Sequence, residues 1–405
     1  MNSIQSLRLI HELYFKKGLP DLDLIQSYGL LAVKIGQIHA LRPDFLSAEK
    51  CNHLAKLYRS AKQIPAEDID SLIATYGGPN FLSHFKNIDK KPLAVASVGQ
   101  VYRATKVSGE EVVIKVIKKS FKDKFSKDVK RLRKFFKLVL FLFPKLKGVG
   151  NPLGILEDIE SYTLAELDLR NEAIGRSILE EEYTRYKDKF DLSMLSFIEI
   201  DKELSGENIL VSSFIQAPTV DELLTEGKFT YADMLKLFYL QGFYMFIAGK
   251  FHGDIHPGNI MYDGSRFYFV DTAFVGVVGD KIRKGLLSFF ESLSNYDYKA
   301  CAHFLNEMAD TSIEGEVFEG FEKKFLELYK DFKGKTVTEV SLTKQMMFTI
   351  KLGVESGMKF EKGIFAIIRS LMYLDGMVLK CNPNAIIMND MRLFYEKYKT
   401  IYDEL

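Results

Sequence analysis

Cysteine is scarce in this chain, which has three cysteines among its 405 residues. Cys51, Cys301 and Cys381 lie far apart, without the pairing pattern of a disulfide framework or the short spacing of a cysteine-based zinc site. Both of these architectures are therefore excluded. The usage is typical of a protein in a reducing compartment.

An excess of one charge is also missing, because 55 Lys and Arg residues stand against 54 Asp and Glu residues, a net charge of +1. General nucleic-acid binders carry a strong basic excess. The balance therefore excludes nucleic acid as a general partner. Any phosphate chemistry must come from a local site.

Long apolar runs are absent too. The longest, around Leu138–Phe143, is far shorter than the roughly 18–20 residues that span a bilayer. The first residues place charges on both sides of a short apolar stretch and lack the cleavage signal of a secretory leader. We expect a cytoplasmic protein with no signal peptide and no transmembrane segment, for which any membrane role is peripheral.

What is present is a composition that can build a large core, with 47% apolar and 27% charged residues. Apolar residues recur at helical spacing to about residue 90, β-branched residues dominate after Pro92, and helical spacing returns beyond Pro218. This order predicts a bilobal α+β fold. We expect an N-terminal helical segment at 1–90, a small β-rich lobe at 91–217 and a helical lobe at 218–405.

Within the β-rich lobe, Leu93–Thr105 and Val112–Lys118 predict an antiparallel hairpin that turns at Ser108–Glu110. A basic helix at Phe121–Phe143 and one long acidic helix at Leu153–Tyr186 should follow. The other expected elements are strands at 195–200, 209–215, 260–262 and 267–270, a helix at 231–250, and only helices from 280 onward.

The sharpest chemical signal is the segment 251–260, FHGDIHPGNI, which is followed by Asp271 at the end of the next hairpin. Phosphoryl transfer needs oxygen ligands for magnesium and a group that positions the nucleophile. Asp254 would orient or deprotonate the nucleophile, while Asn259 and Asp271 would hold the metal. The plain alternative is a polar turn that closes a hairpin.

Lys115 stands inside the apolar strand Val112–Ile117, where a lysine is expensive to bury without a partner. A solvent-facing lysine on an edge strand is the alternative interpretation. Asp168 and Glu172 on the acidic helix lie one turn apart, and like charges at that spacing repel each other unless nearby cations neutralise them. Lys115 and Lys34 are both candidate cations.

The first turn of the predicted hairpin lies where a kinase would cover phosphates with a glycine-rich loop. Here the residues are Leu93–Tyr102, with Ala94, Ala96 and Ser97 as candidate nucleotide contacts. Most of the glycines that allow close backbone approach are absent. The loop is therefore either an ordinary turn or a nucleotide loop of restricted backbone freedom.

Together these motifs resemble the UbiB family of atypical kinase-like proteins, which is linked to ubiquinone biosynthesis. The resemblance extends from about residue 29 to residue 276, and its most specific part is the lysine–glycine–glutamine motif at the N-terminus. It is carried by Lys34-Ile-Gly36-Gln37 with Arg42-Pro43-Asp44, by Ala94–Gln100, by Lys115, by Glu166-Leu-Asp168 with Glu172, and by His252–Asn259 with Asp271.

The resemblance implies a protein-kinase-like fold whose N-terminal helices pack over the active site. Glu172 would pair with Lys115, and Lys34 and Gln37 would meet Glu166 and Asp168 in a regulatory arrangement. The ligands implied are ATP or ADP with Mg²⁺, or with Mn²⁺ as the alternative ion. Ser213 and Ile215 would contact the adenine. The chain departs from the family in Thr272-Ala273, where Phe-Gly is more frequent after the aspartate.

Three functions follow from these residues and from the resemblance. The first is a kinase-like ATPase or phosphotransferase that acts on or near isoprenoid-quinone or other lipid metabolism, with an adenine nucleotide and a lipid or isoprenoid as partners. The second is a nucleotide-gated scaffold without turnover. The third is a small-molecule kinase of the aminoglycoside or choline type, which shares the loop around Asp254 but not the segment Lys34–Asp44.

Overall fold

The computed structural model describes residues 1–40, 46–58, 66–95, 98–117, 119–142, 152–360 and 363–404. The chain forms two compact units: unit 1 comprises Met1–Ile174 and Glu199–Phe214, and unit 2 comprises Gly175–Ile198 and Ile215–Leu405. The N-terminal helices and the first sheet thus share one compact unit. None of the helices in the described ranges is both long and apolar enough to cross a lipid bilayer.

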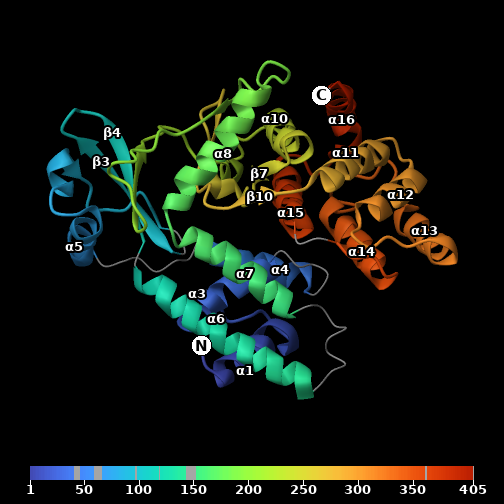
Figure 1. Ribbon diagram of the computed structural model, residues 1–405, viewed down its shortest axis with the longest axis horizontal. Coiled ribbons are helices and arrows are strands. Elements are labelled where there is room, and N and C mark those ends of the chain that lie inside the picture. Colours follow the sequence, from blue (N-terminus) through green and yellow to red (C-terminus); the bar gives the residue numbers. More distant parts are fainter. Residues whose placement is uncertain are drawn as a thin grey trace. The chain divides into compact units, whose positions relative to one another are not determined.

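The helical part of unit 1 is built around one apolar core (Figure 1). Asn2 caps the first helix with a capping box. Its side chain accepts a hydrogen bond from the backbone amide of Gln5, and the side chain of Gln5 accepts one from the backbone amide of Asn2. Leu9, Leu31, Phe125 and Leu156 come from four helices of this core. The elements are α1 (Ser3–Ile10), the π-helix η1 (His11–Phe15), α2 (Leu22–Ser27), α3 (Leu30–Ala40), α4 (Ala48–Leu54), the 3-10 helix η2 (Ala55–Tyr58), α6 (Lys119–Leu142) and α7 (Pro152–Glu166).

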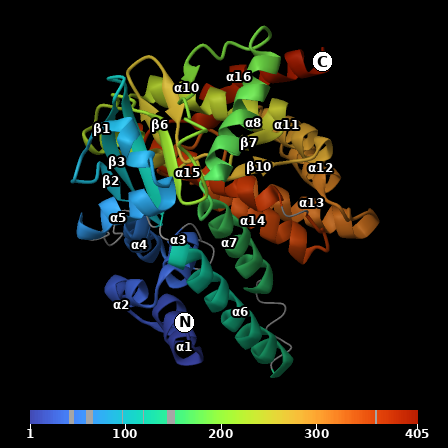
Figure 2. The same ribbon diagram turned by 60° about the vertical axis from the view of Figure 1, so that its left-hand side comes forward.

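The sheet of unit 1 is antiparallel, with the order β1-β3-β4-β6, and β2 pairs with β3 (Figure 2). Gly109 adopts a positive φ of 91° in the turn between β3 and β4, as that tight turn requires. Helix α5 (Ala66–Gly77) covers one face, where Ile69 and Ile73 pack with Ile114. The strands are β1 (Phe85–Ile88), β2 (Ala94–Val95), β3 (Gly99–Lys106), β4 (Glu111–Ile117) and β6 (Ile209–Ser213), and the 3-10 helix η3 (Phe81–His84) precedes β1.

The single acidic helix predicted over Leu153–Tyr186 is wrong, because the chain bends after Glu166 and forms α7 and then α8 (Arg170–Tyr186). Leu167 and Leu169 are both buried at the bend. A continuous helix would turn residues two apart to different faces. The bend lets both leucines enter the core, and it takes Asp168 out of the regular helix.

Unit 2 combines short strands with a helical bundle whose members lie before and after them in sequence (Figure 1). The predicted helix at 231–250 is α10 (Tyr231–Gly242) continued by the π-helix η5 (Phe243–Ala248), and Gly249 ends it with a positive φ of 70°. The strands are β5 (Leu195–Ser196), β7 (Lys250–His252), β8 (Ile260–Tyr262), β9 (Phe267–Phe269) and β10 (Val275–Val277). The other helices are α9 (Val220–Thr225), the 3-10 helix η6 (Pro257–Asn259), α11 (Asp280–Ser294), α12 (Tyr298–Met308), α13 (Gly315–Tyr329), α14 (Leu342–Glu355), α15 (Gly363–Cys381) and α16 (Ile387–Asp403).

Two antiparallel strand pairs of unit 2 position the candidate site. Strand β7 pairs with β10, and β8 pairs with β9, which also takes β5 as a parallel neighbour. The segment Gly253–Asn259 therefore runs from the end of β7 to the start of the β8–β9 hairpin. Aromatic rings such as Phe246, Phe290 and Tyr398 fill the core of the helical bundle.

Candidate functional site

Lys115 lies in β4, the strand between β3 and β6, opposite Val101 and Leu210. Val112, Ile114 and Val116 face the core on the α5 side of the sheet, so the alternation of the strand directs Lys115 to the other face. There its ammonium forms an ion pair with Glu172, and both side chains are buried. Lys115 is thus a buried, paired lysine and not a solvent-facing one.

Glu172 stands in the first turn of α8, where the positive end of the helix dipole favours a carboxylate. Its backbone amide donates to the carbonyl of Leu169 in the preceding bend. A buried ion pair is stable only when both partners are well placed. The bend between α7 and α8 therefore helps to set the position of Lys115 through Glu172.

A second buried ion pair joins α3 to the end of α7, between Lys34 and Glu166. The Lys34 ammonium also lies over the Tyr162 ring, 5.0 Å from its centre. Gln37, one turn further along α3, donates from Nε2 to the carbonyl of Leu57 at 3.2 Å. Helix α3 thus places Lys34 against the end of α7, as the resemblance led us to expect.

Asp168 does not share this arrangement, contrary to expectation. Its carboxylate accepts from Arg170 Nε at 2.8 Å and Nη2 at 2.6 Å, and Lys122 lies 3.8 Å away. Hydrogen bonding to Arg170 lowers the pKa of the Asp168 carboxyl group. Asp168 is also off the helix face of Glu172, because it lies in the bend before α8.

The expected nucleotide contacts of unit 1 are only partly within the described residues. Ala94 is exposed in β2, and Ala96 and Ser97 lie outside the described ranges, as do Arg42, Pro43 and Asp44. Ser213 ends β6, and its hydroxyl accepts a hydrogen bond from the Glu199 amide at 3.0 Å. Ile215 is half-buried and belongs to unit 2.

In unit 2, the side chain of Asn259 holds the loop that carries Asp254. Asn259 Nδ2 donates to the Asp254 backbone carbonyl at 3.0 Å and to its Oδ2 at 3.1 Å. Within the loop, the Gly258 amide donates to His256 Nδ1 at 3.1 Å. These contacts orient the Asn259 amide, with its nitrogen toward Asp254.

Asp271 is brought to Asn259 by the β8–β9 hairpin. Ile260 pairs with Phe269, and beyond them the Val270 amide donates to the Asn259 carbonyl at 3.0 Å. Asp271 follows directly, with a left-handed φ of 55°. Aspartate tolerates this region better than most residues, and a non-glycine residue there is uncommon and often found at functional sites.

His252 connects these two parts, a role that the sequence did not reveal. Its Nδ1 accepts from the Asp254 amide at 3.2 Å, so Nε2 carries the proton that it donates to the Val270 carbonyl at 2.9 Å. Burial lowers the pKa of His252, which keeps the ring neutral. The imidazole thus fixes Asp254 relative to the residue before Asp271.

Two side chains of helix α15 make further contacts that no motif signalled. Arg369 Nη2 donates to the Gly253 carbonyl at 2.6 Å, and its guanidinium lies 5.1 Å from the centre of the Phe274 ring. The Tyr373 ring packs edge-on against His256 with centres 5.4 Å apart. The loop 253–259 is therefore held from a helix about a hundred residues further along the chain.

Gly175 marks a close approach in unit 2 between α8 and the segment after Asp271. A Cβ added at Gly175 would lie 1.9 Å from the Thr272 carbonyl oxygen, which no side chain can accommodate. Glu172 stands three residues earlier on the same helix. Within unit 2, Gly175 thus allows α8 to lie directly against Thr272, the residue that follows Asp271.

The donors of unit 2 suit a hard cation bound with a phosphate. No three His, Cys, Asp or Glu side chains converge as a metal site anywhere in the described ranges. Asn259 and Asp271 instead offer one amide oxygen and one carboxylate, the number that Mg²⁺ often takes from a protein when substrate phosphates and water complete its shell. A buried strand lysine paired with a helix glutamate, together with Asp, Asn and Asp in this order, is the residue set of the kinase-like proteins.

Comparisons with known proteins agree with that class. The model of the ABC1 atypical kinase-like domain matches residues 56–305, and the chain belongs to this family. A "Probable protein kinase UbiB" of Glaesserella parasuis is 24% identical over 92% of this chain and 69% of the relative. An uncharacterized aarF domain-containing protein kinase, chloroplastic, of Arabidopsis thaliana is 23% identical over 96% of this chain and 75% of the relative.

Among solved structures, Rv3197 of Mycobacterium tuberculosis, determined in complex with erythromycin, matches with a TM-score of 0.54 and 17% identity, over 94% of this chain and 96% of that one. The predicted protein-kinase-like α+β fold is thereby confirmed. Lys34 lies before the residues that the family model matches, and helix α15 lies after them.

Proposed function

We propose that the protein binds ATP with Mg²⁺ and transfers its terminal phosphoryl group, to water or to a small or lipid-like acceptor in isoprenoid-quinone or other lipid metabolism. The observation that carries this proposal is the arrangement of Asp254, Asn259 and Asp271 around the β8–β9 hairpin. The family membership supports nucleotide binding.

Each residue has a definite role in this proposal. Lys115, held by Glu172, contacts nucleotide phosphates, and Asp254 orients the attacking hydroxyl or water and accepts its proton. Asn259 uses its nitrogen on Asp254, so its amide oxygen is the atom left to join Asp271 in holding Mg²⁺. The bound ion would neutralise charge on the phosphates.

The decisive variant is Asp271→Asn. Asparagine tolerates left-handed φ as aspartate does, so the substitution removes the charge and keeps the backbone favourable. The wild-type protein should be stabilised by ATP and further by Mg²⁺ with ATP, by about 2.7 kcal/mol when the ligand is at about 100 times its Kd. The Asp271→Asn variant should lose the additional stabilisation by Mg²⁺ and should no longer hydrolyse ATP.

The matched control is Asp331→Asn, at an exposed aspartate of unit 2 that lies away from this loop. The Asp331→Asn variant should keep both the Mg²⁺-dependent stabilisation and the ATP hydrolysis of the wild type. Absence of any thermal shift with wild-type protein at millimolar ATP and Mg²⁺ would contradict the proposal. Binding without hydrolysis or transfer would instead support the nucleotide-gated scaffold.

A further inference from the structure

Arg369 of helix α15 contacts two segments of the candidate site at once, and all of these residues belong to unit 2. Its Nη2 donates to the carbonyl of Gly253, the residue before Asp254, at 2.6 Å. Its guanidinium also lies over the ring of Phe274, 5.1 Å from the centre, and Phe274 follows Asp271 by three residues. One side chain thus contacts both the loop that carries Asp254 and the segment that follows Asp271.

These two segments are also hydrogen-bonded to each other. The Gly253 amide donates to the Phe274 carbonyl at 2.9 Å. A Cβ added at Gly253 would lie 2.2 Å from Cδ1 of Phe274, so the backbone passes directly against that ring. We call this contact the Gly253–Phe274 junction. Arg369 contacts both of its members, one through a charge-assisted hydrogen bond and the other through the face of the aromatic ring.

Helix α15 is a firm support for Arg369. Ile368, the residue before it, is buried. Further along the helix, Asp375 accepts hydrogen bonds from the Ser341 hydroxyl at 2.8 Å and from the Thr343 amide at 3.2 Å, which ties α15 to the start of α14. A side chain on a packed helix fixes a loop more precisely than a side chain on another loop.

The charge of Arg369 acts in the same region as the charges of the two aspartates. Burial lowers the pKa of His252, whose ring joins the two segments. Among the weaker effects, Asp254 and Asp271 raise this pKa and Arg369 lowers it. All three charges therefore lie close enough to act on one imidazole. A cation here reduces the electrostatic cost of holding two carboxylates in one region.

We propose that Arg369 is a positioning residue for phosphoryl transfer. Through the Gly253–Phe274 junction it fixes Asp254, the proposed base, relative to Asp271, the proposed metal ligand. Such positioning matters because a displacement of about 1 Å at a reacting group lowers turnover by about a hundredfold. The turnover experiment rests on the proposed function, whereas the junction itself is tested without nucleotide.

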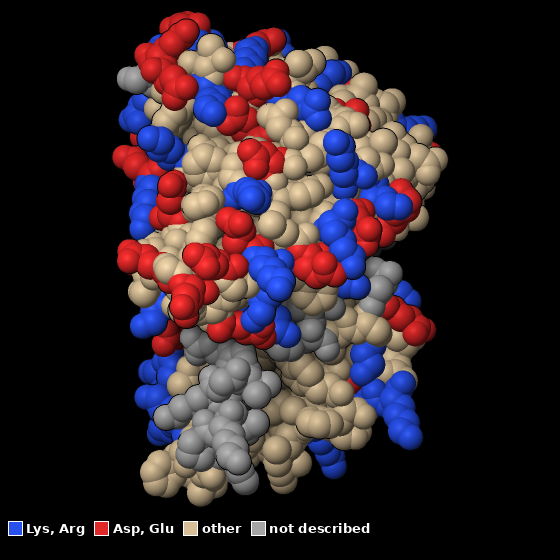
Figure 3. All heavy atoms as spheres, turned by 90° about the vertical axis from the view of Figure 1, so that its right-hand side faces the viewer, with Lys and Arg blue, Asp and Glu red and all other residues tan. Residues whose placement is uncertain are grey.

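The test compares Arg369→Gln with a matched control, Arg392→Gln. Arg392 of α16 is also half-buried in unit 2 and makes the same two kinds of contact outside the candidate site. It donates to the Ser294 carbonyl from Nη2 at 2.6 Å and from Nε at 3.1 Å, and it lies 5.9 Å from the centre of the Tyr296 ring. Each variant removes one positive charge from unit 2, whose helices in the upper part of Figure 3 carry Lys and Arg interspersed with Asp and Glu. General losses of stability and of charge should therefore be alike in the two variants.

The first measurement is hydrogen exchange in the protein without nucleotide. Peptides that cover 253–259 and 272–276 should exchange at least about tenfold faster in Arg369→Gln than in wild type, because the junction opens locally. Arg392→Gln should exchange like wild type in these peptides. Wild-type exchange of both segments in Arg369→Gln would overturn the proposal, whether or not the protein hydrolyses ATP.

The second measurement is ATP hydrolysis with Mg²⁺. Arg369→Gln should lower kcat at least about tenfold and change the Kd for ATP with Mg²⁺ by less than about threefold, since it disturbs the reacting geometry and leaves the phosphate contacts of Lys115 in place. Arg392→Gln should keep the wild-type kcat. Equal losses of kcat in Arg369→Gln and Arg392→Gln would show a merely structural role and overturn the proposal.

A milder variant covers the case in which Arg369→Gln does not fold. Arg369→Lys keeps the charge but loses the planar fork, so it should change exchange and kcat in the same direction by a smaller factor. No change in either measurement would then overturn the proposal. A wild type that neither binds nor hydrolyses ATP would refute the proposed function, and the exchange experiment would still decide whether Arg369 holds the junction.

Discussion

Lys34 shows how much the meaning of one residue depends on its surroundings. On an isolated helix it would be an ordinary surface lysine, but in unit 1 its side chain is 5% exposed and its ammonium is held by Glu166 and the Tyr162 ring. A buried charge left without its partner is strongly destabilising. An exposed ion pair contributes little because water and salt screen it.

We predict that Lys34→Ala lowers the free energy of unfolding by about 3–5 kcal/mol in urea titrations. Lys34→Arg should recover only part of this loss, because the planar guanidinium does not fit the place of a compact ammonium. The control is Lys90→Ala, whose pair with Asp70 is 70% and 57% exposed and should contribute less than about 1 kcal/mol. Equal small effects of Lys34→Ala and Lys90→Ala would show that the Lys34 pair does not support the fold.

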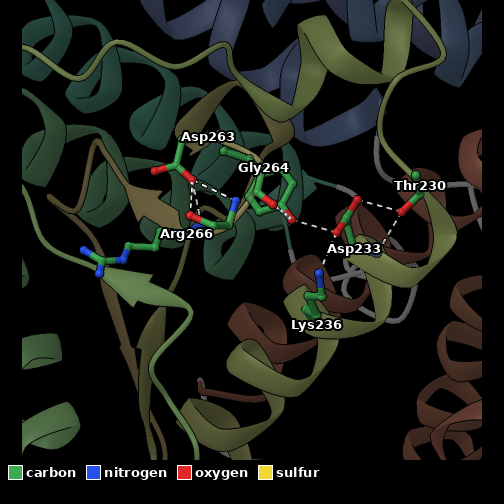
Figure 4. A network of polar contacts seen from close by, with 8 residues as sticks. Thr230, Asp233, Lys236, Asp263, Gly264 and Arg266 are labelled. Carbon is green, nitrogen blue, oxygen red and sulfur yellow. Dashed lines mark hydrogen bonds and ion pairs between the residues drawn. The ribbon is translucent and has the colours of Figure 1, made fainter.

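At the scale of single elements, the β8–β9 hairpin matters because Asn259 stands before it and Asp271 follows it. Its turn is closed by Asp263, which accepts from the amides of Ser265 at 2.8 Å and Arg266 at 2.7 Å (Figure 4). Tyr262 connects the hairpin to α10, since its hydroxyl contacts Asp233 at 2.7 Å. The spacing of the proposed metal ligands thus depends on a turn outside the site.

This turn should make stability depend on pH in a defined window. Burial would raise the pKa of Asp263, but hydrogen bonds from Arg266 and Ser265 outweigh it and lower the pKa to about 2. Because the folded pKa lies below the unfolded value, the stabilisation is present above about pH 4 and is lost as the pH falls toward 2. Asp263→Asn should therefore lower the free energy of unfolding by about 1 kcal/mol or less at pH 6, since the exposed carboxylate is screened. The difference in unfolding free energy between wild type and variant should be smaller at pH 3.

Urea unfolding of the wild type, Asp263→Asn and the control Asp331→Asn at both pH values measures this effect. The control replaces an exposed aspartate outside the hairpin and should show no narrowing. A difference between wild type and Asp263→Asn that is constant with pH would rule out the ionised carboxylate as its cause.

Helix α8 is the second element with a decisive position, because Gly175 allows it to approach Thr272 in unit 2. We predict that Gly175→Ala lowers the free energy of unfolding by about 1–3 kcal/mol, through overpacking against a backbone carbonyl, and weakens Mg²⁺-dependent ATP binding. Gly320→Ala in α13 is the control, since a Cβ there meets open space. It should be neutral or stabilising by up to about 1 kcal/mol. Similar stabilities of the two variants would refute the steric role of Gly175.

At the scale of the whole molecule, the near balance of charge has a consequence for solubility. The sequence has a pI of about 7.6, so long-range repulsion between molecules is weakest near that pH. We predict minimum solubility in low salt between pH 7 and pH 8, measured by light scattering across a pH series. A minimum that lies elsewhere would mean that local patches, and not net charge, govern association.

Much of the fold follows from the sequence alone, because local patterns decide it. The run of β-branched residues around Lys115 specifies β4, and the turn at Ser108–Glu110 fits a hairpin. Segment 251–260 and Asp271 mark the chemical loop without knowledge of their neighbours. The motif at Lys34 predicts a pairing with the acidic helix, and Glu166 provides it.

Only the tertiary structure shows which side chains are in contact where long-range packing brings them together. The bend that separates Asp168 from Glu172 arises because Leu167 and Leu169 both enter the core, which helical spacing cannot reveal. Arg369 reaches Gly253 from a distant helix, and Gly175 fits beneath Thr272, through contacts that leave no local pattern. The sequence determined the chemistry that this protein can carry, because residue types and short spacings encode it, whereas long-range packing decided where each charged group finds its partner.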